Sequence, residues 1–445
     1  YISLFFIIFL IYNNKTMKAK IFLLCLIAVA ICKETTSDVK SIKLNYLPEN
    51  QFFTYPLSVG SPAQVFEVQI DTTTSETWVP SFNTSYNVTP KYNALLSSTS
   101  NTTNKTVEIN DEEGDVIGKA TYDDIKFGEF ALKQFGFAQV VNYEVETFTD
   151  YPKGKLGVGF NHERGDNFNF IKSLKNNGLI EKEMFTIIPK SHEIVIGSLP
   201  VDAENITTCK IAPTEDLDDD YRQGWVCELT HVFLSDNDIE SSIDDAHDVP
   251  ARVIFDSAYH FISVPKVHFD LFNKSFIVPL FNNSCHIERA HHEKYFVCDA
   301  SEETLSKASI SFVIGGYAYT LKQDSLFEKN EAGQYELLIR FKEEHDDIWA
   351  FGFPFLDNYN VVFDYENKTV GFYAGETIDM YEDWMTWMNG ESPKQKKEKM
   401  KMLITGACVL GTVLLLLVIC LICRACKKKQ INEHGPLMQN EEIKQ

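Results

Sequence analysis

The chain has 445 residues, of which 44% are hydrophobic and 13% aromatic, and its formal net charge is −22. This length allows two or three domain-sized units, and the hydrophobic content is sufficient for a large buried core. The negative charge argues against binding to nucleic acid, because phosphate recognition requires a basic surface. Plain solubility is the favoured interpretation of this charge, and function in an acidic compartment is the alternative.

The N-terminal region has the pattern of a secretory signal. Residues 1–16 contain an apolar run too short to span a bilayer, and we interpret them as an upstream extension of doubtful status. Met17 is followed by two lysines, an apolar stretch and the small-residue cleavage pattern Ala28-Val29-Ala30. We therefore expect residues 17–32 to be a signal peptide that directs the rest of the chain into a secretory compartment.

The region after the signal is predicted to be mainly β. Residues 66–70 read FEVQI, in which apolar and polar side chains alternate with a period of two. Turn clusters such as residues 59–62 (VGSP) separate segments of this kind. Helical periodicity is sparse, and we expect helices at residues 170–178 and 265–272. Many short strands with few helices predict an all-β fold class.

Two of the predicted strands end in an aspartate that is followed by a hydroxyl residue. The first ends in Asp71-Thr72 and the second in Asp256-Ser257, so the aspartates lie 185 positions apart (256 minus 71). Apolar segments rich in glycine follow at residues 154–159 and 349–352, which indicates two similar halves with a boundary near residues 197–205. Two carboxylates delivered in this way can share one proton and activate a water molecule.

These segments, in this order, resemble the pepsin-like aspartic proteases from about Phe53 to Gly375. The resemblance implies a bilobal pepsin-like fold in which each lobe supplies one catalytic aspartate, Asp71 and Asp256, to a central cleft. It also implies that Thr72, Thr74 and Ser257 support the pair and that a peptide or protein binds in the cleft. No metal or nucleotide site is visible in the sequence, so we expect no cofactor. The matching segments are residues 55–64, 71–81, 156–159, 256–258, 349–352 and 360–372.

Residues 402–423 are uncharged and rich in Leu and Val, so they are predicted to form one C-terminal transmembrane helix. Lysine and arginine flank this segment on both sides, so the positive-inside rule does not orient it. The signal peptide orients the segment instead, because it places the preceding residues outside the cytosol, and it predicts a single-pass type I membrane protein. The predicted parts are a bilobal domain at 33–375 (N-lobe about 50–197, C-lobe about 198–375), a stalk at 376–401, the span, and a cytosolic tail at 424–445.

Four of the ten cysteines lie in the predicted ectodomain, and an even number in an oxidising compartment indicates two disulfides. Sequence proximity favours Cys209 with Cys227 and Cys285 with Cys298. None of these spacings is typical of a zinc site.

Glycosylation acceptors support an extracellular or endosomal/lysosomal location for the ectodomain. Eight Asn-x-Ser/Thr sequons lie on one side of the predicted span. They are Asn83, Asn87, Asn101, Asn104, Asn205, Asn273, Asn282 and Asn367.

The sequence departs from the family pattern next to both aspartates. Thr73 and Ala258 stand where the family has glycine, Tyr259 replaces a small hydroxyl residue, and Lys155 replaces an apolar residue of the supporting strand. Residues 107–115, which correspond to the flap hairpin over the cleft, contain acidic residues and no tyrosine. Two hypotheses follow: an aspartic-type endopeptidase anchored in a membrane, or an inactive ectodomain that binds peptides or a protein partner.

Overall fold

The computed structural model describes residues 39–47, 52–85, 87–109, 115–144, 153–160, 168–214, 217, 221–235, 247–290, 293–342, 348–375 and 377–379. The upstream extension, the signal peptide, most of the stalk, the predicted membrane span and the tail lie outside these ranges. Within them, no helix is both long and apolar enough to cross a membrane. The described residues up to Ile378 form one compact unit.

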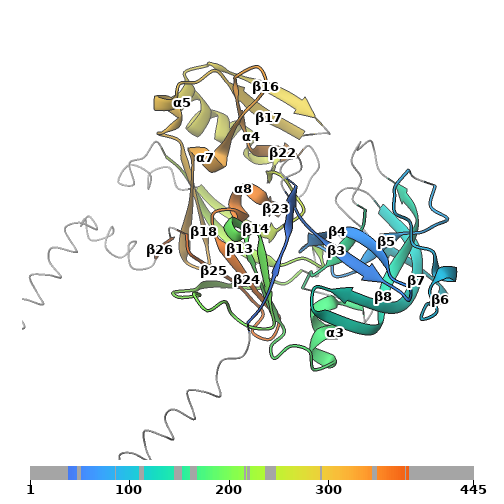
Figure 1. Cartoon of the computed structure of the whole chain (residues 1–445). Helices are drawn as coiled ribbons and strands as arrows, with labels where there is room; N and C mark the ends of the chain where they lie inside the picture. Colours follow the sequence, from blue (N-terminus) through green and yellow to red (C-terminus); the bar gives the residue numbers. More distant parts are fainter. Residues whose placement is uncertain are drawn as a thin grey trace, which may run out of the picture. The chain divides into compact units, whose positions relative to one another are not determined.

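The N-terminal half of this unit forms one sheet, drawn in blue and teal in Figure 1. Its strands arise where the sequence alternates, and the apolar side chains Phe66, Val68 and Ile70 are fully buried. In spatial order the strands are β2 (Asn45–Leu47), β3 (Phe52–Val59), β4 (Gln64–Asp71), β9 (Lys155–Gly157), β5 (Trp78–Pro80), β8 (Phe130–Glu144), β7 (Asp115–Phe127) and β6 (Asn101–Ile109).

The C-terminal half forms a second, larger sheet. Strand β26 (Thr377–Asp379) lies at one end of this sheet, next to β19 (Tyr317–Lys322). The others, in spatial order, are β20 (Phe327–Lys329), β21 (Tyr335–Leu337), β17 (Glu293–Cys298), β22 (Ile339–Lys342), β15 (Ile262–Pro265), β23 (Ile348–Phe351), β14 (His247–Phe255), β13 (Val226–Ser235), β18 (Ser309–Ile314) and β19. An additional strand, β16 (Cys285–Ala290), pairs with β17.

The two sheets repeat one arrangement around their aspartates. In the first, β4 pairs in parallel with β9, β9 is antiparallel to β5, and β5 is parallel to β8. In the second, β14 is parallel to β23, β23 is antiparallel to β15, and β15 is parallel to β22. The strands that lead to Asp71 and Asp256 therefore occupy equivalent places in the two halves, as the sequence predicts.

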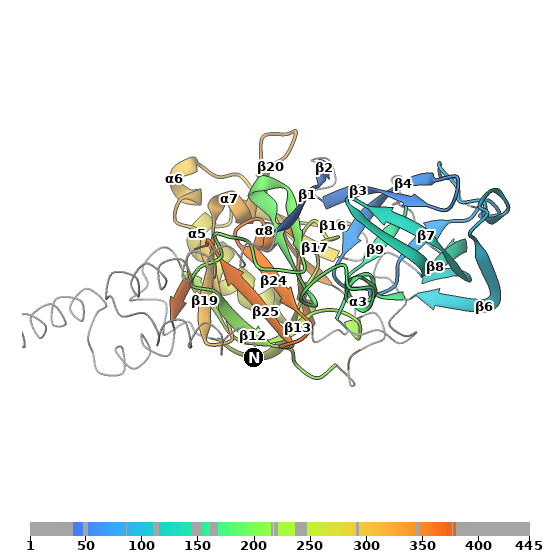
Figure 2. The same ribbon diagram turned by 60° about the horizontal axis from the view of Figure 1, so that its bottom comes forward.

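A third sheet joins the two halves. In spatial order it contains β1 (Lys40–Lys43), β11 (Glu193–Ile196), β10 (Met184–Ile188), β24 (Asn360–Asp364), β25 (Thr369–Tyr373) and β12 (Thr207–Lys210). Strand β10 from the first half pairs with β24 from the second, and Figure 2 shows β25 between β24 and β12. The predicted boundary at residues 197–205 thus falls between β11 and β12 of this shared sheet.

Helices are few, and both predicted ones are present. Helix α3 (Phe170–Asn176) begins where the side chain of Asn169 accepts the amide of Lys172, and it is followed by Gly178 at φ +68. The second predicted helix starts at η5 (Lys266–His268) and continues as α4 (Phe269–Phe272), the π-helical turn η6 (Asn273–Ile277) and α5 (Val278–Phe281). The other short helices among the described residues are η1 (Ala94–Leu96), η3 (Pro189–Ser191), α6 (Glu302–Leu305), α7 (Gln323–Leu326) and α8 (Phe353–Leu356).

The hydrophobic core runs continuously through both halves. Trp225, which is fully buried, donates its ring N–H to the carbonyl oxygen of Val158 at 2.8 Å. The hydroxyl of Tyr365 donates to the same oxygen at 2.9 Å, and the two rings lie 4.6 Å apart. Two side chains of the C-terminal half thus satisfy the backbone just beyond β9, so the strand beside Asp71 is supported from both halves.

Candidate active site

Asp71 is the last residue of β4 and is fully buried. Its Oδ1 atom accepts hydrogen bonds from the amide of Thr73 at 2.8 Å, from the hydroxyl of Thr73 at 2.7 Å and from the amide of Thr74 at 3.3 Å. One oxygen of this carboxyl group is therefore saturated by the loop that follows the strand, and Oδ2 is the oxygen that other groups can approach.

Asp256 follows the last residue of β14 and is also buried. Its amide donates to the carbonyl oxygen of Phe351 at 3.0 Å, which continues the pairing with β23. Its Oδ1 atom accepts the amide of Ala258 at 2.8 Å. The same spacing of two residues links Asp71 to Thr73, so the two loops hold their carboxyl groups in equivalent ways.

Thr73 and Ala258 fit the two loops although the family resemblance predicts glycine at both positions. Neither is among the described residues that have a positive φ, so neither loop requires the backbone freedom that is special to glycine. The hydroxyl of Thr73 also adds a hydrogen bond to Asp71 that glycine does not supply. The substitutions change the environment of the carboxyl groups without breaking the loops.

The hydroxyl residues after the aspartates bind the two loops to each other. Thr72 donates its hydroxyl to the carbonyl oxygen of Phe255 at 2.6 Å and accepts the amide of Ser257 at 3.0 Å. Ser257 in turn donates its hydroxyl to the carbonyl oxygen of Ile70 at 2.7 Å. Segments that are almost 200 residues apart in the sequence are thereby fastened together immediately beside the two aspartates.

Thr74, predicted to support the aspartates, does so mainly through its backbone. Its amide reaches Asp71, whereas its hydroxyl donates to the side-chain oxygen of Gln223 at 3.2 Å. The amide of Ser75 donates to the same oxygen at 2.9 Å. Gln223 is therefore a second support of the loop that the sequence did not reveal, because no local pattern links a glutamine to a loop 149 residues earlier.

Lys155 makes the most unexpected contact of the site. Its Nζ atom lies 3.0 Å from Oδ2 of Asp71, and the two side chains are 2% and 0% exposed. The sequence marks Lys155 as an unusual residue in an apolar strand, yet it does not reveal the partner. The ammonium group thus contacts the one oxygen of Asp71 that the loop leaves open.

Burial and the charge of Lys155 act in opposite directions on the pKa of Asp71. Burial alone raises the pKa of this carboxyl group, because a low dielectric disfavours the charged form. The Lys155 ammonium, together with hydrogen bonds from Thr73 and from Lys155 itself, outweighs burial and holds the pKa below its ordinary value. Asp71 therefore stays ionised at lower pH than an ordinary aspartate does.

Tyr259, the large residue beside the second loop, has its own polar partner. Its hydroxyl donates to the side chain of Glu293 at 2.7 Å, and the ammonium of Lys342 lies 5.8 Å from the centre of its ring. Glu293 and Lys342 pair across β17 and β22. These contacts anchor the ring on the C-terminal sheet.

The predicted flap corresponds to the hairpin of β6 and β7. Val107 pairs with Gly118 and Ile109 with Val116, and the three apolar side chains are buried. The acidic tip, residues 110–114, lies outside the described residues.

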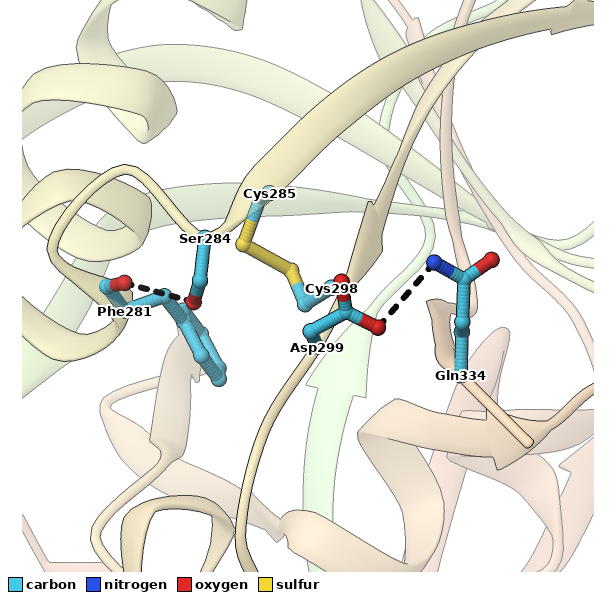
Figure 3. Close-up of a disulfide and its surroundings, with 6 residues drawn as sticks. All are labelled: Phe281, Ser284, Cys285, Cys298, Asp299 and Gln334. Carbon is cyan, nitrogen blue, oxygen red and sulfur yellow. Dashed lines mark hydrogen bonds between the residues drawn. A yellow bond between two sulfur atoms is a disulfide. The ribbon is translucent and has the colours of Figure 1, made fainter.

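The structure contains both disulfides that sequence proximity favours. Cys209–Cys227 connects β12 of the shared sheet to β13 of the C-terminal sheet. Cys285–Cys298 joins directly paired residues of β16 and β17, and Figure 3 shows it between two local hydrogen bonds, from Ser284 to Phe281 and from Gln334 to Asp299.

Comparison with known proteins agrees with this architecture. The family model described as "Eukaryotic aspartyl protease" matches residues 52–374. The chain is 23% identical over 339 residues to a renin of Echis ocellatus and 24% identical over 329 residues to an embryonic pepsinogen of Gallus gallus; each alignment covers 71% of this chain and 78% of the relative. A pregnancy-associated glycoprotein 6 of Ovis aries is 24% identical over 332 residues, with 71% and 79% coverage.

The family match covers more than half of the chain and includes both aspartate loops, the strand that carries Lys155 and all three sheets except β1, β2 and β26. The repeated strand arrangement and the hydrogen bonds between the loops lie within the same range. The chain belongs to the eukaryotic aspartyl protease family.

Proposed function

We propose that the protein is an aspartic-type endopeptidase in which Asp71 and Asp256 together activate a water molecule. The observation that carries this proposal is the set of hydrogen bonds between Thr72, Ser257 and the strands before the aspartates, because it fastens the two aspartate loops to each other. A peptide or protein substrate binds across the two loops. Neither a cofactor nor a metal is part of the proposed reaction.

In the proposed reaction the Asp71 carboxylate accepts a proton from the water as its oxygen attacks the carbonyl carbon of the peptide bond. Asp256 in its protonated form donates its proton to the carbonyl oxygen. When the resulting tetrahedral intermediate collapses, one of its hydroxyl groups returns a proton to Asp256, the carbon–nitrogen bond breaks, and the departing amine takes up from Asp71 the proton that came from the water. The low pKa of Asp71 supports this division of roles.

A second candidate is a catalytically inactive protein that binds peptides or a protein partner at the same loops. The contact between Lys155 and Oδ2 of Asp71 favours this alternative, because an attacking water also needs this oxygen. Thr73, which adds a side chain beside Asp71, points in the same direction.

Peptide cleavage by the purified full-length chain distinguishes the two candidates. The endopeptidase should cleave a peptide library somewhere between about pH 3 and pH 7 and should be blocked by a pepstatin-type inhibitor. The Asp71→Asn and Asp256→Asn variants are the matched controls, since each keeps the shape of the side chain. Binding of peptides without cleavage at any pH in this range would leave the inactive binder as the function.

We further propose a single-pass type I membrane protein whose glycosylated ectodomain lies outside the cell or in the endosomal/lysosomal lumen. Seven of the eight sequon asparagines are exposed, and the eighth, Asn273, is half-buried. Two disulfides are typical of an oxidising compartment. Glycosidase digestion and alkaline extraction of membranes test the idea: an unglycosylated chain that washes off the membrane would contradict it.

A further inference from the structure

Lys155 is fixed in place by the sheet on both sides of its strand. Strand β9 lies between β4 and β5, where Lys155 pairs with Gln69 on one side and with Trp78 on the other. Its side chain is 2% exposed, so its ammonium group has almost no access to water. A buried ammonium without a partner is strongly disfavoured, and therefore the contact with Asp71 is expected to persist for as long as the strand is folded.

This position changes the distribution of protons in the site. Two neighbouring carboxyl groups ordinarily keep one proton between them, because a second negative charge is repelled by the first. We propose that Lys155 is a positioning residue of the aspartate pair: its ammonium holds Asp71 as the carboxylate and so leaves Asp256 as the group that binds and releases the proton. This assignment rests on the proposed peptidase function and specifies which of the two carboxyl groups carries the proton.

The groups that face Asp71 support the assignment. From β9 comes the ammonium of Lys155 and from its own loop the hydroxyl and amide of Thr73, while the loop that carries Asp256 is bonded to this loop through Thr72 and Ser257. Glu76, a further buried carboxyl group, lies on the loop that leads into β5, where the hydroxyl of Ser75 donates to it at 3.2 Å. Lys155 is the charge that lowers the pKa of Asp71 most strongly.

The consequence is that the pH range over which the peptidase works should be shifted towards acid. A positive charge beside the pair favours loss of the proton from each carboxyl group, so both sides of a bell-shaped pH profile lie at lower pH than they would without it. Removing the ammonium should move the whole profile to higher pH.

A double-mutant cycle tests the assignment without any need for activity. The unfolding free energy of the full-length chain is measured against pH for the wild type, Lys155→Met, Asp71→Asn and the variant that carries both substitutions. Lys155→Met should be much less stable than the wild type at neutral pH. The difference in unfolding free energy between the two should become smaller in acid, because the unpaired Asp71 then takes up a proton. The doubly substituted variant should be more stable than Lys155→Met at neutral pH, because no carboxylate is then buried without a partner, and its own stability should lack the pH dependence that Asp71 gives the wild type. It remains informative if Lys155→Met alone does not fold.

Lys153→Met is the matched control, because Lys153 is an exposed lysine two positions before Lys155. Its unfolding free energy should depend on pH in the same way as that of the wild type. The role of Lys155 would be overturned if the difference in unfolding free energy between Lys155→Met and the wild type were the same in acid and at neutral pH. It would also be overturned if Lys153→Met showed the same difference.

The pH profile of cleavage then tests the role in the reaction. The midpoints of the Lys155→Met profile should lie about one pH unit or more above those of the wild type, while those of Lys153→Met stay in place. Midpoints that coincide in all three proteins would overturn the proposal. A complete lack of cleavage in the wild type instead removes the peptidase function, and the stability cycle still decides whether Lys155 holds Asp71 ionised.

Discussion

The hydroxyl of Thr72 accepts the amide hydrogen of Ser257 over 3.0 Å, although 185 residues separate them in the chain. Each residue directly follows one of the two aspartates, so the contact sets the separation of the two loops. Because Thr72 also donates to the carbonyl oxygen of Phe255, one buried hydroxyl satisfies two backbone groups of the opposite loop.

Replacement of Thr72 by Val should therefore destabilise the protein by about 2–6 kcal/mol, since it leaves two buried backbone groups without partners. Cleavage should fall by about 10²-fold or more, because the carboxyl groups lose their fixed separation. Urea unfolding and kcat/KM are the measurements. Thr72→Ser keeps the hydroxyl and is the control; equal losses in both variants would mean that the methyl group, and not the hydrogen bonds, matters here.

The hydroxyl of Thr73 should help to keep Asp71 ionised. In the folded protein the pKa of Asp71 is lowered, so its contribution to stability is present above the pKa that it has in the unfolded chain and is lost as the pH falls through the folded value. Thr73→Val removes one hydrogen bond to the carboxylate, so this loss should begin at a higher pH than in the wild type.

Urea unfolding in steps of pH measures this effect, with Thr73→Ser as the variant that retains the bond. If Thr73→Val and Thr73→Ser lose stability at the same pH, the hydroxyl of Thr73 does not contribute to the acidity of Asp71.

The two disulfides should differ in their contribution to stability. Cys209–Cys227 connects two sheets and both of its cysteines are buried, whereas Cys285–Cys298 closes a local hairpin and Cys285 is partly exposed. Replacing Cys285 and Cys298 by Ala should lower the unfolding free energy by about 2–4 kcal/mol, and the same change at Cys209 and Cys227 should lower it further by leaving a cavity. Urea unfolding of the two double variants makes the comparison, and a larger loss from the hairpin pair would contradict it.

Much of the fold follows from local patterns in the sequence. The period-two alternation before Asp71 predicts a half-buried strand, and β4 is that strand, with Phe66, Val68 and Ile70 in the core. The glycine after residues 170–177 predicts the end of a helix, and α3 ends just before Gly178. These features depend on neighbours within a few residues, and the sequence states those neighbours directly.

The fit of Thr73 and Ala258 could not be predicted in this way. Whether a position requires glycine depends on the φ angle that the folded loop adopts there and on the atoms around it. The loop places Thr73 at an ordinary φ, and its hydroxyl points to Asp71. The sequence alone shows only that glycine is missing.

The sequence by itself determined the family, the β-rich architecture, the two aspartate loops and the preferred disulfide partners, because each of these is written in residue order and short spacings. The tertiary structure alone decided that Lys155 lies against Asp71, that Gln223 supports the first loop and that Thr72 and Ser257 fasten the loops together. Those contacts join strands and loops brought together only when the sheets form. Their electrostatic effect also depends on burial, which no single residue type specifies.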